Sequence, residues 1–119
     1  MTPLVFIAAA LAGGVGAARR HLADLAVARL AGRRVPWGIL LVNVSGSFAL
    51  GLVSGLASEA LFIVGAGLLG GYTTFSTAML DTVALWRDGE RPASALNLLG
   101  AFVLSVAAAL AGLALTATV

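Results

Sequence analysis

Four long apolar segments, separated by short connectors, take up almost the whole chain. They predict helices over residues 3–29, 37–57, 60–86 and 92–117. A helix needs roughly 20 apolar residues to cross the hydrocarbon core of a bilayer, and each segment reaches that length. With 61% hydrophobic and 10% charged residues, the chain lacks the polar surface of a soluble domain, which carries about 25% charged residues. The sequence therefore predicts an all-α integral membrane protein, with one four-helix transmembrane domain over residues 1–119.

The remaining composition excludes several other classes of protein. The absence of cysteine excludes disulfides and thiolate chemistry. The net charge of +2 is typical of loops beside a membrane rather than of a nucleic-acid surface. The single histidine, His21, has no Ser–Asp partners in a catalytic arrangement, so we expect no enzyme. Asp24 lies one helical turn from Arg20 and His21, and we expect a local ion pair there. Arginines follow the first apolar segment rather than precede it, which favours a retained transmembrane helix over a signal peptide.

The arginines of the connectors lie on one side of the predicted bundle. That side carries Arg29, Arg33, Arg34, Arg87 and Arg91, whereas the side with both termini and Glu59 has no lysine or arginine. Positively charged loops of membrane proteins remain in the cytoplasm. We therefore expect a multi-pass protein of the cell membrane, with its arginine loops inside and its termini outside.

The second segment, "WGILLVNVSGSFALGLVSGL", places small and polar residues at four-residue spacing. Asn43, Ser47 and Gly51 fall on one stripe, which lets helices approach each other closely. An uncompensated amide in hydrocarbon costs several kcal/mol, so Asn43 is expected to face a partner or a cavity. Two interpretations stay open at this point, a structural bond between helices and a place on a polar pathway.

The third segment contains "GGYTTFSTAMLDTVALW", residues 70–86. The ten residues before it form about 15 Å of helix, which reaches the middle of the bilayer. Gly70 and Gly71 are costly in a helix interior, and they are followed by the acidic Asp81 and by four hydroxyls, those of Thr73, Thr74, Ser76 and Thr77. Non-helical backbone survives at membrane depth only inside protein or along a watery cavity, where its freed carbonyls can bind ions. We therefore predict a functional break around Gly70, the alternative being a kink healed by the threonines.

"GGYTTFST", "PWGILLVNVSGSFALG" and "GGVGAARR" resemble the small bacterial fluoride channels of the Fluc or CrcB family, and the resemblance covers nearly the whole chain. It implies an antiparallel dimer of oppositely inserted subunits in the membrane lipid, with pores along the subunit interface. It also implies passive export of fluoride, which lowers fluoride in the cytoplasm. A structural sodium ion, Na+, is expected at the dimer centre and is not transported.

The resemblance assigns roles to individual residues. Gly70 and Thr73 would offer backbone carbonyls to sodium, and Arg20 matches an arginine of the family's first helix with a structural or vestibule role. The fluoride pore would take Asn43, whose amide donates to the anion, together with Phe75, Ser76, Thr77, Asp81 and Ser105. Asp81 stands where a glutamate is usual.

Three positions depart from the family pattern. Ala78 replaces a second pore phenylalanine, Ala101 replaces a tyrosine and Ile39 replaces a threonine. A subunit that inserts both ways should also have balanced loop charges, and this chain does not. We therefore hypothesise a heterodimer with an oppositely oriented paralogue, the alternative being a homodimer.

Two other functions are alternatives to a conducting channel subunit. A non-conducting scaffold subunit would fit the loss of aromatic pore residues at Ala78 and Ala101. A small multidrug proton antiporter is disfavoured because the outer part of the first helix has no membrane-embedded acid.

Overall fold

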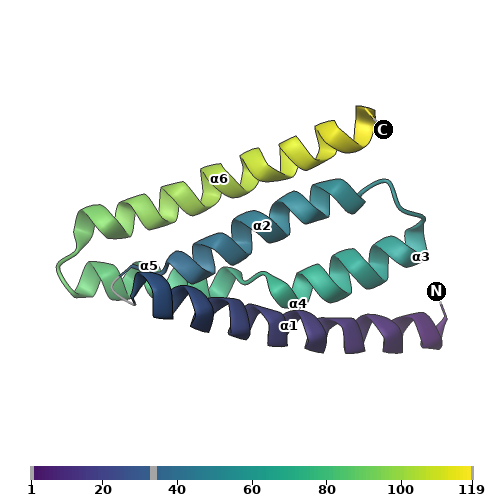
Figure 1. Cartoon of the computed structure of the whole chain (residues 1–119), viewed down its shortest axis with the longest axis horizontal. Helices are drawn as coiled ribbons and strands as arrows, with labels where there is room; N and C mark the ends of the chain where they lie inside the picture. The colour runs from purple at the N-terminus through teal and green to yellow at the C-terminus, as the bar shows by residue number, and fades with distance from the viewer. Residues whose placement is uncertain (1, 33–34, 119) are drawn as a thin grey trace.

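The computed structural model describes residues 2–32 and 35–118, and every regular element within these ranges is helical. The elements are α1 (Pro3–Ala31), α2 (Trp37–Val53), α3 (Ser58–Leu61), the π-helix η1 (Phe62–Leu69), α4 (Gly70–Tyr72), α5 (Phe75–Arg87) and α6 (Arg91–Thr118). The elements from α3 to α5 follow one another along a single path, and together they form an interrupted span beside the other helices (Figure 1). The all-α prediction is confirmed for the described residues.

The helices have the length and exposure of membrane spans. Pro3–Ala31, Ser58–Arg87 and Arg91–Thr118 are long and apolar enough to cross a bilayer, and Trp37–Val53 is a shorter apolar helix. Large apolar side chains are exposed along these helices, including Leu11 at 68% and Leu96 at 72%. An apolar surface of this extent needs lipid or a partner chain to cover it. These lengths and exposures are those of a helical membrane protein.

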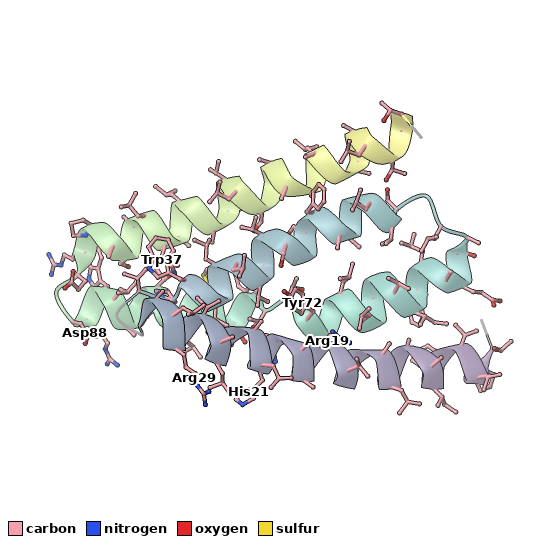
Figure 2. All side chains as sticks on the ribbon, in the orientation of Figure 1. Arg19, His21, Arg29, Trp37, Tyr72 and Asp88 are labelled. Carbon is pink, nitrogen blue, oxygen red and sulfur yellow. The ribbon has the colours of Figure 1, made fainter. Side chains whose placement is uncertain are left out.

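Both termini lie at the same end of the molecule (Figure 1). The C-terminal end of α1, the start of α2 and the turn between α5 and α6 lie at the opposite end, where Figure 2 shows Arg29 and Asp88. Arg29, Arg87 and Arg91 therefore share one end, as the sequence predicted. Arg33 and Arg34 fall outside the described residues.

Local signals fix where the helices begin and end. The Thr2 hydroxyl accepts a hydrogen bond from the Val5 N–H at 3.2 Å, and Pro3 occupies the first turn of α1. Gly32 ends α1 and Gly89 forms the turn after α5, both with φ of 79°. That backbone conformation favours glycine because it has no Cβ.

Helix α1 packs against η1 and α4 through glycines. A Cβ on Gly71 would collide with the Gly13 carbonyl, and a Cβ on Gly16 would lie 2.8 Å from the Tyr72 amide nitrogen. Side chains at these positions would push the two spans apart. Gly13 and Gly16 in "GGVGAARR" and Gly71 in "GGYTT" therefore bring two backbones into direct contact.

Helix α6 is joined to α2 and to α5 by different contacts. Gly51 and Gly112 meet at the α2–α6 crossing, where a Cβ on either would lie 3.0 Å from the Cα of the other. At the arginine end, the buried Ser94 hydroxyl donates to the Thr82 carbonyl at 2.7 Å, and Asn97 Nδ2 donates to Thr82 Oγ1 at 2.9 Å. These bonds fix α5 on α6.

Two sequence-based boundaries differ from the structure. The helix expected over 37–57 ends at Val53, where the Ser54 hydroxyl turns back to the Gly51 carbonyl at 2.7 Å. The predicted break in the third span is confirmed, but it lies at Thr73 and Thr74 rather than at Gly70, since Gly70–Tyr72 is helical. Gly71 serves the contact with α1, and neither Gly70 nor Gly71 unwinds the chain.

Candidate functional site

The third span is interrupted by two extended residues. Thr73 has φ −83° and ψ 160°, and Thr74 has φ −150° and ψ 124°. Helix α5 then begins with Thr74 as its N-cap, because the Thr74 hydroxyl accepts from the Thr77 N–H at 3.2 Å. The break is therefore a short strand-like segment between two helical halves.

Asn43 reaches from α2 to this segment and bonds both polar groups of one residue. Its Nδ2 donates to the Thr74 carbonyl at 2.8 Å, and the Thr74 N–H donates to Asn43 Oδ1 at 2.8 Å. In a continuous helix the Thr74 N–H would donate to the Gly70 carbonyl four residues earlier. Asn43 therefore accepts the hydrogen bond from the Thr74 N–H, which would otherwise continue the helix across the break.

Tyr72 and Gly46 fix the break against α2. The Tyr72 hydroxyl lies 3.0 Å from the Ser45 hydroxyl, and Tyr72 lies near the middle of the molecule in Figure 2. A Cβ on Gly46 would collide with the Thr73 methyl group and lie 3.1 Å from the Tyr72 ring. Sequence reasoning missed Ser45 and Tyr72, because a hydroxyl pair on two different spans leaves no local pattern.

Arg20 bonds the end of the first half of the broken span. Its Nη1 donates to the Thr73 carbonyl at 3.2 Å. A cation is favourable here because the last carbonyls of a helix lack partners and carry partial negative charge. Arg20 thus stabilises the break, and its predicted ion pair with Asp24 is wrong. Among the described residues, Asp24 forms no ion pair with His21 either.

Arg20→Met should destabilise the protein by about 2 kcal/mol, since a hydrogen bond from a charged donor contributes about 1.5–3 kcal/mol. Arg19→Met is the matched control because the Arg19 side chain is exposed, and we expect it to change the stability by less than about 0.5 kcal/mol. Chemical denaturation of the purified protein measures both. Equal losses in the two variants would show that the Arg20–Thr73 bond contributes nothing of its own.

A cleft of about 490 Å³ opens beside the break, between α2, the interrupted span and α6. Five of the predicted site residues line it: Asn43, Gly70, Thr73, Phe75 and Ser105. Ala78, Ala101 and Phe102 line it as well. Phe75 and Phe102 are 78% and 70% exposed, so their rings lie at an open face of the chain. The cleft therefore brings one asparagine, two threonines, two serines and two phenylalanines together among apolar side chains.

The other predicted pore residues lie elsewhere. Thr77 and Asp81 line a second cavity of about 120 Å³, together with Asp24 and the start of α2. Ser76 is exposed and lines neither cavity. The polar residues of α5 thus follow the helix away from the main cleft, toward the arginine end.

The CrcB-like protein family, described as camphor resistance (CrcB), matches residues 7–113. This chain belongs to the CrcB family. The resemblance inferred from "GGYTTFST" and the second helix is thereby confirmed, and the match covers all four spans. The broken third span and Asn43 both lie within the residues that match the family.

CrcB-family relatives match nearly end to end. A protein named fluoride-specific ion channel FluC 2 from Mycobacterium tuberculosis (strain ATCC 25618 / H37Rv) is 41% identical over 114 residues, covering 94% of this chain and 90% of the relative. A FluC 2 from Nitrobacter hamburgensis is 43% identical over 119 residues, covering 94% and 93%. A FluC from Agrobacterium fabrum is 43% identical over 114 residues, covering 89% and 90%.

Proposed function

We propose that this chain is a subunit of a fluoride channel that exports the anion passively across the cell membrane. The observation that carries the proposal is the cleft beside the broken span, which Asn43, Phe75 and Ser105 line together. The names of the CrcB-family relatives support fluoride as the ion. They also support a channel rather than an enzyme.

The groups in the cleft suit a small, strongly hydrated anion. Fluoride must exchange its water for strong donors, and an Asn amide and a Ser hydroxyl can supply them. The positive edge of a phenylalanine ring attracts an anion without binding it too firmly to leave. Thr77 and Asp81 in the second cavity would continue a polar path toward the arginine end. Ser76, which is exposed on α5, would join this path in the assembled channel.

A structural sodium ion fits the donors at the break. Gly70 and Thr73 both line the cleft, and the Gly70 carbonyl has lost its usual helical donor, because the Thr74 N–H donates to Asn43. The Thr73 carbonyl accepts from Arg20 and has a second lone pair. Neutral carbonyls from two chains would hold the cation, and its charge would attract fluoride to the dimer.

The assembly that we propose is an antiparallel dimer in which the open face of the cleft meets a second subunit. The arginines at one end favour a single orientation, with that end in the cytoplasm and both termini outside. A chain of fixed orientation needs an oppositely oriented paralogue to form such a dimer. We therefore propose a heterodimer.

The chain reconstituted alone in liposomes should release trapped fluoride no faster than protein-free liposomes do. Co-reconstitution with the paralogue should restore the efflux, and a fluoride electrode measures both. Reporter tags should place both termini outside the cell. Robust efflux from the chain alone, or termini on both faces of the membrane, would refute obligate pairing and favour a homodimer.

A non-conducting scaffold subunit is the second candidate, and one observation favours it. Ala78 and Ala101 line the cleft where the resemblance implies aromatic rings, so part of the anion path is missing. Phe102 lies next to Ala101 in the chain and lines the same cleft, which offers a replacement for the lost tyrosine. This replacement favours the conducting subunit.

Deletion of the gene from its own host tests the proposed function. We expect the deleted cells to retain more fluoride in the cytoplasm and to stop growing at lower external fluoride. The wild-type gene should restore export, whereas Asn43→Ala should not. Unchanged fluoride retention in the deleted cells would contradict the proposal, and full complementation by Asn43→Ala would favour the scaffold role.

A further inference from the structure

The side-chain amide of Asn43 forms two hydrogen bonds with the backbone of Thr74. Both hydrogen bonds are 2.8 Å long and run in opposite directions between one side chain and one residue of backbone. Neighbouring extended strands exchange an N–H and a carbonyl in the same way. Thr73 and Thr74 have the extended backbone of a strand. The Asn43 side chain forms the hydrogen bonds that a neighbouring strand would form in a sheet.

We propose that Asn43 is a positioning residue that holds the third span open at Thr73–Thr74. This proposal rests on the proposed fluoride channel and deepens it, since it gives the residue that lines the cleft a second task beside donating to the anion. The Nδ2 group has two hydrogens, and one of them is used on the Thr74 carbonyl. The other remains for an anion in the cleft, so both roles fit one side chain.

The pair of hydrogen bonds between Asn43 and Thr74 is called the clamp from here on. It is needed because the third span would otherwise close into a continuous helix. Without Asn43, the Thr74 N–H would be unpaired at membrane depth, where each unsatisfied backbone group is costly. The nearest acceptor for this N–H is the Gly70 carbonyl, to which it would donate in a continuous helix. Closing the helix would occupy one carbonyl of the proposed sodium site, and it would turn α5 and Phe75 relative to the cleft. Asn43 prevents this by supplying a partner both to the N–H and to the carbonyl of Thr74.

The amide of asparagine is specific for this contact. It presents one donor and one acceptor side by side, whereas aspartate presents acceptors only. Asn43→Asp would keep the bond from the Thr74 N–H and would place a charge against the Thr74 carbonyl. Asn43→Ala removes both bonds. Comparison of the two variants therefore separates the effect of the bond to the Thr74 N–H from the effect of the bond to its carbonyl.

Hydrogen exchange of the Thr74 amide in lipid nanodiscs tests the clamp without any transport assay. We expect exchange in Asn43→Ala to be faster than in the wild type by about tenfold, the effect of one lost hydrogen bond, because the Ser45–Tyr72 contact opposes closure and the Thr74 N–H then bonds to the Gly70 carbonyl only part of the time. In Asn43→Asp the Thr74 amide should remain protected, and the Leu80 amide inside α5 should be unchanged in both variants. Equal protection of Thr74 in the wild type and in Asn43→Ala would overturn the proposal.

A backbone ester at Thr74 tests the consequence for transport while Asn43 stays intact. The ester replaces the N–H by oxygen and so removes one of the two bonds. We expect fluoride efflux from the reconstituted complex to fall about tenfold, whereas an ester at Leu80, which is 68% exposed on α5, should change efflux less than twofold. In an Asn43→Ala background the Thr74 ester should have no further effect.

The outcomes distinguish the clamp from the channel. Normal efflux with the Thr74 ester, combined with lost efflux in Asn43→Ala, would mean that Asn43 acts on the anion alone and would overturn the clamp. Thr74 protection that is lost in Asn43→Ala supports the clamp even in a complex that passes no fluoride. Such a complex would count against the proposed function only.

Discussion

Gly71→Val is expected to prevent the chain from assembling into a stable protein. A Cβ at this position would collide with the Gly13 carbonyl and lie 2.8 Å from the Gly13 carbonyl carbon, so the obstacle is backbone that cannot rotate away. Overpacking costs about 1–3 kcal/mol even where side chains can adjust, and occasionally more. Folded proteins are stable by only about 5–15 kcal/mol. The cost here should exceed about 3 kcal/mol because two spans must separate.

Gly14→Val is the matched control for this prediction. Gly14 lies in the same "GGVG" stretch, but nothing lies within 4 Å of a Cβ built on it. Valine is also the better helix former, so Gly14→Val should be neutral or slightly stabilising. The yield of monodisperse protein in detergent and its thermal midpoint measure both variants. If both variants were equally stable, the direct backbone contact between α1 and α4 would not be required for the fold.

Phe75→Ala should lower fluoride efflux by about tenfold, the upper end of what an aromatic contact contributes. The effect should fall on transport because the Phe75 ring is 78% exposed in the chain and lines the cleft. Phe62→Ala is the comparison: its ring packs on Phe6 with centroids 5.5 Å apart. That variant should lower the thermal midpoint and leave the efflux per folded complex near the wild-type rate.

Efflux from the complex purified from host membranes, divided by the amount of folded complex, measures both phenylalanine variants. Phe102→Ala in the same assay shows whether the second exposed ring of the cleft contributes. A wild-type rate in Phe75→Ala would remove this ring from the anion path, and equal losses in Phe75→Ala and Phe62→Ala would point to a general effect of instability.

The sequence was sufficient for the number and type of spans, because apolar length and helix boundaries are local properties. It also identified Asn43 as a residue that needs a partner, since an amide in hydrocarbon must bond to something. The helix ends near Thr2 and Gly32 follow from capping chemistry that the sequence displays.

The position of the break could not be derived from local propensity. Glycine weakens an isolated helix, but Gly71 lies in a helical turn because its missing side chain lets α1 approach. The break occurs where a side chain from another span captures a backbone N–H, and that contact joins residues 31 positions apart. The π-helix η1 was likewise not predicted, because its residues are as apolar as those of an ordinary span.

The separation of the pore residues into two cavities was also beyond the sequence. Phe75 and Asp81 lie on the same helix, yet Phe75 lines the main cleft and Asp81 lines the second cavity beside Asp24. Their placement depends on how α5 is held on α6 by Ser94 and Asn97. These long-range bonds have no signature in the local pattern.

Fluoride efflux from liposomes containing the complex, purified from its own host through a tag on this chain, tests the proposed channel most directly. Purification in this way retains the second subunit, whichever it is. We expect fluoride to leave rapidly, chloride to stay inside, and Asn43→Ala to slow the fluoride efflux. A complex that releases no fluoride, or releases chloride equally fast, would contradict the proposed function.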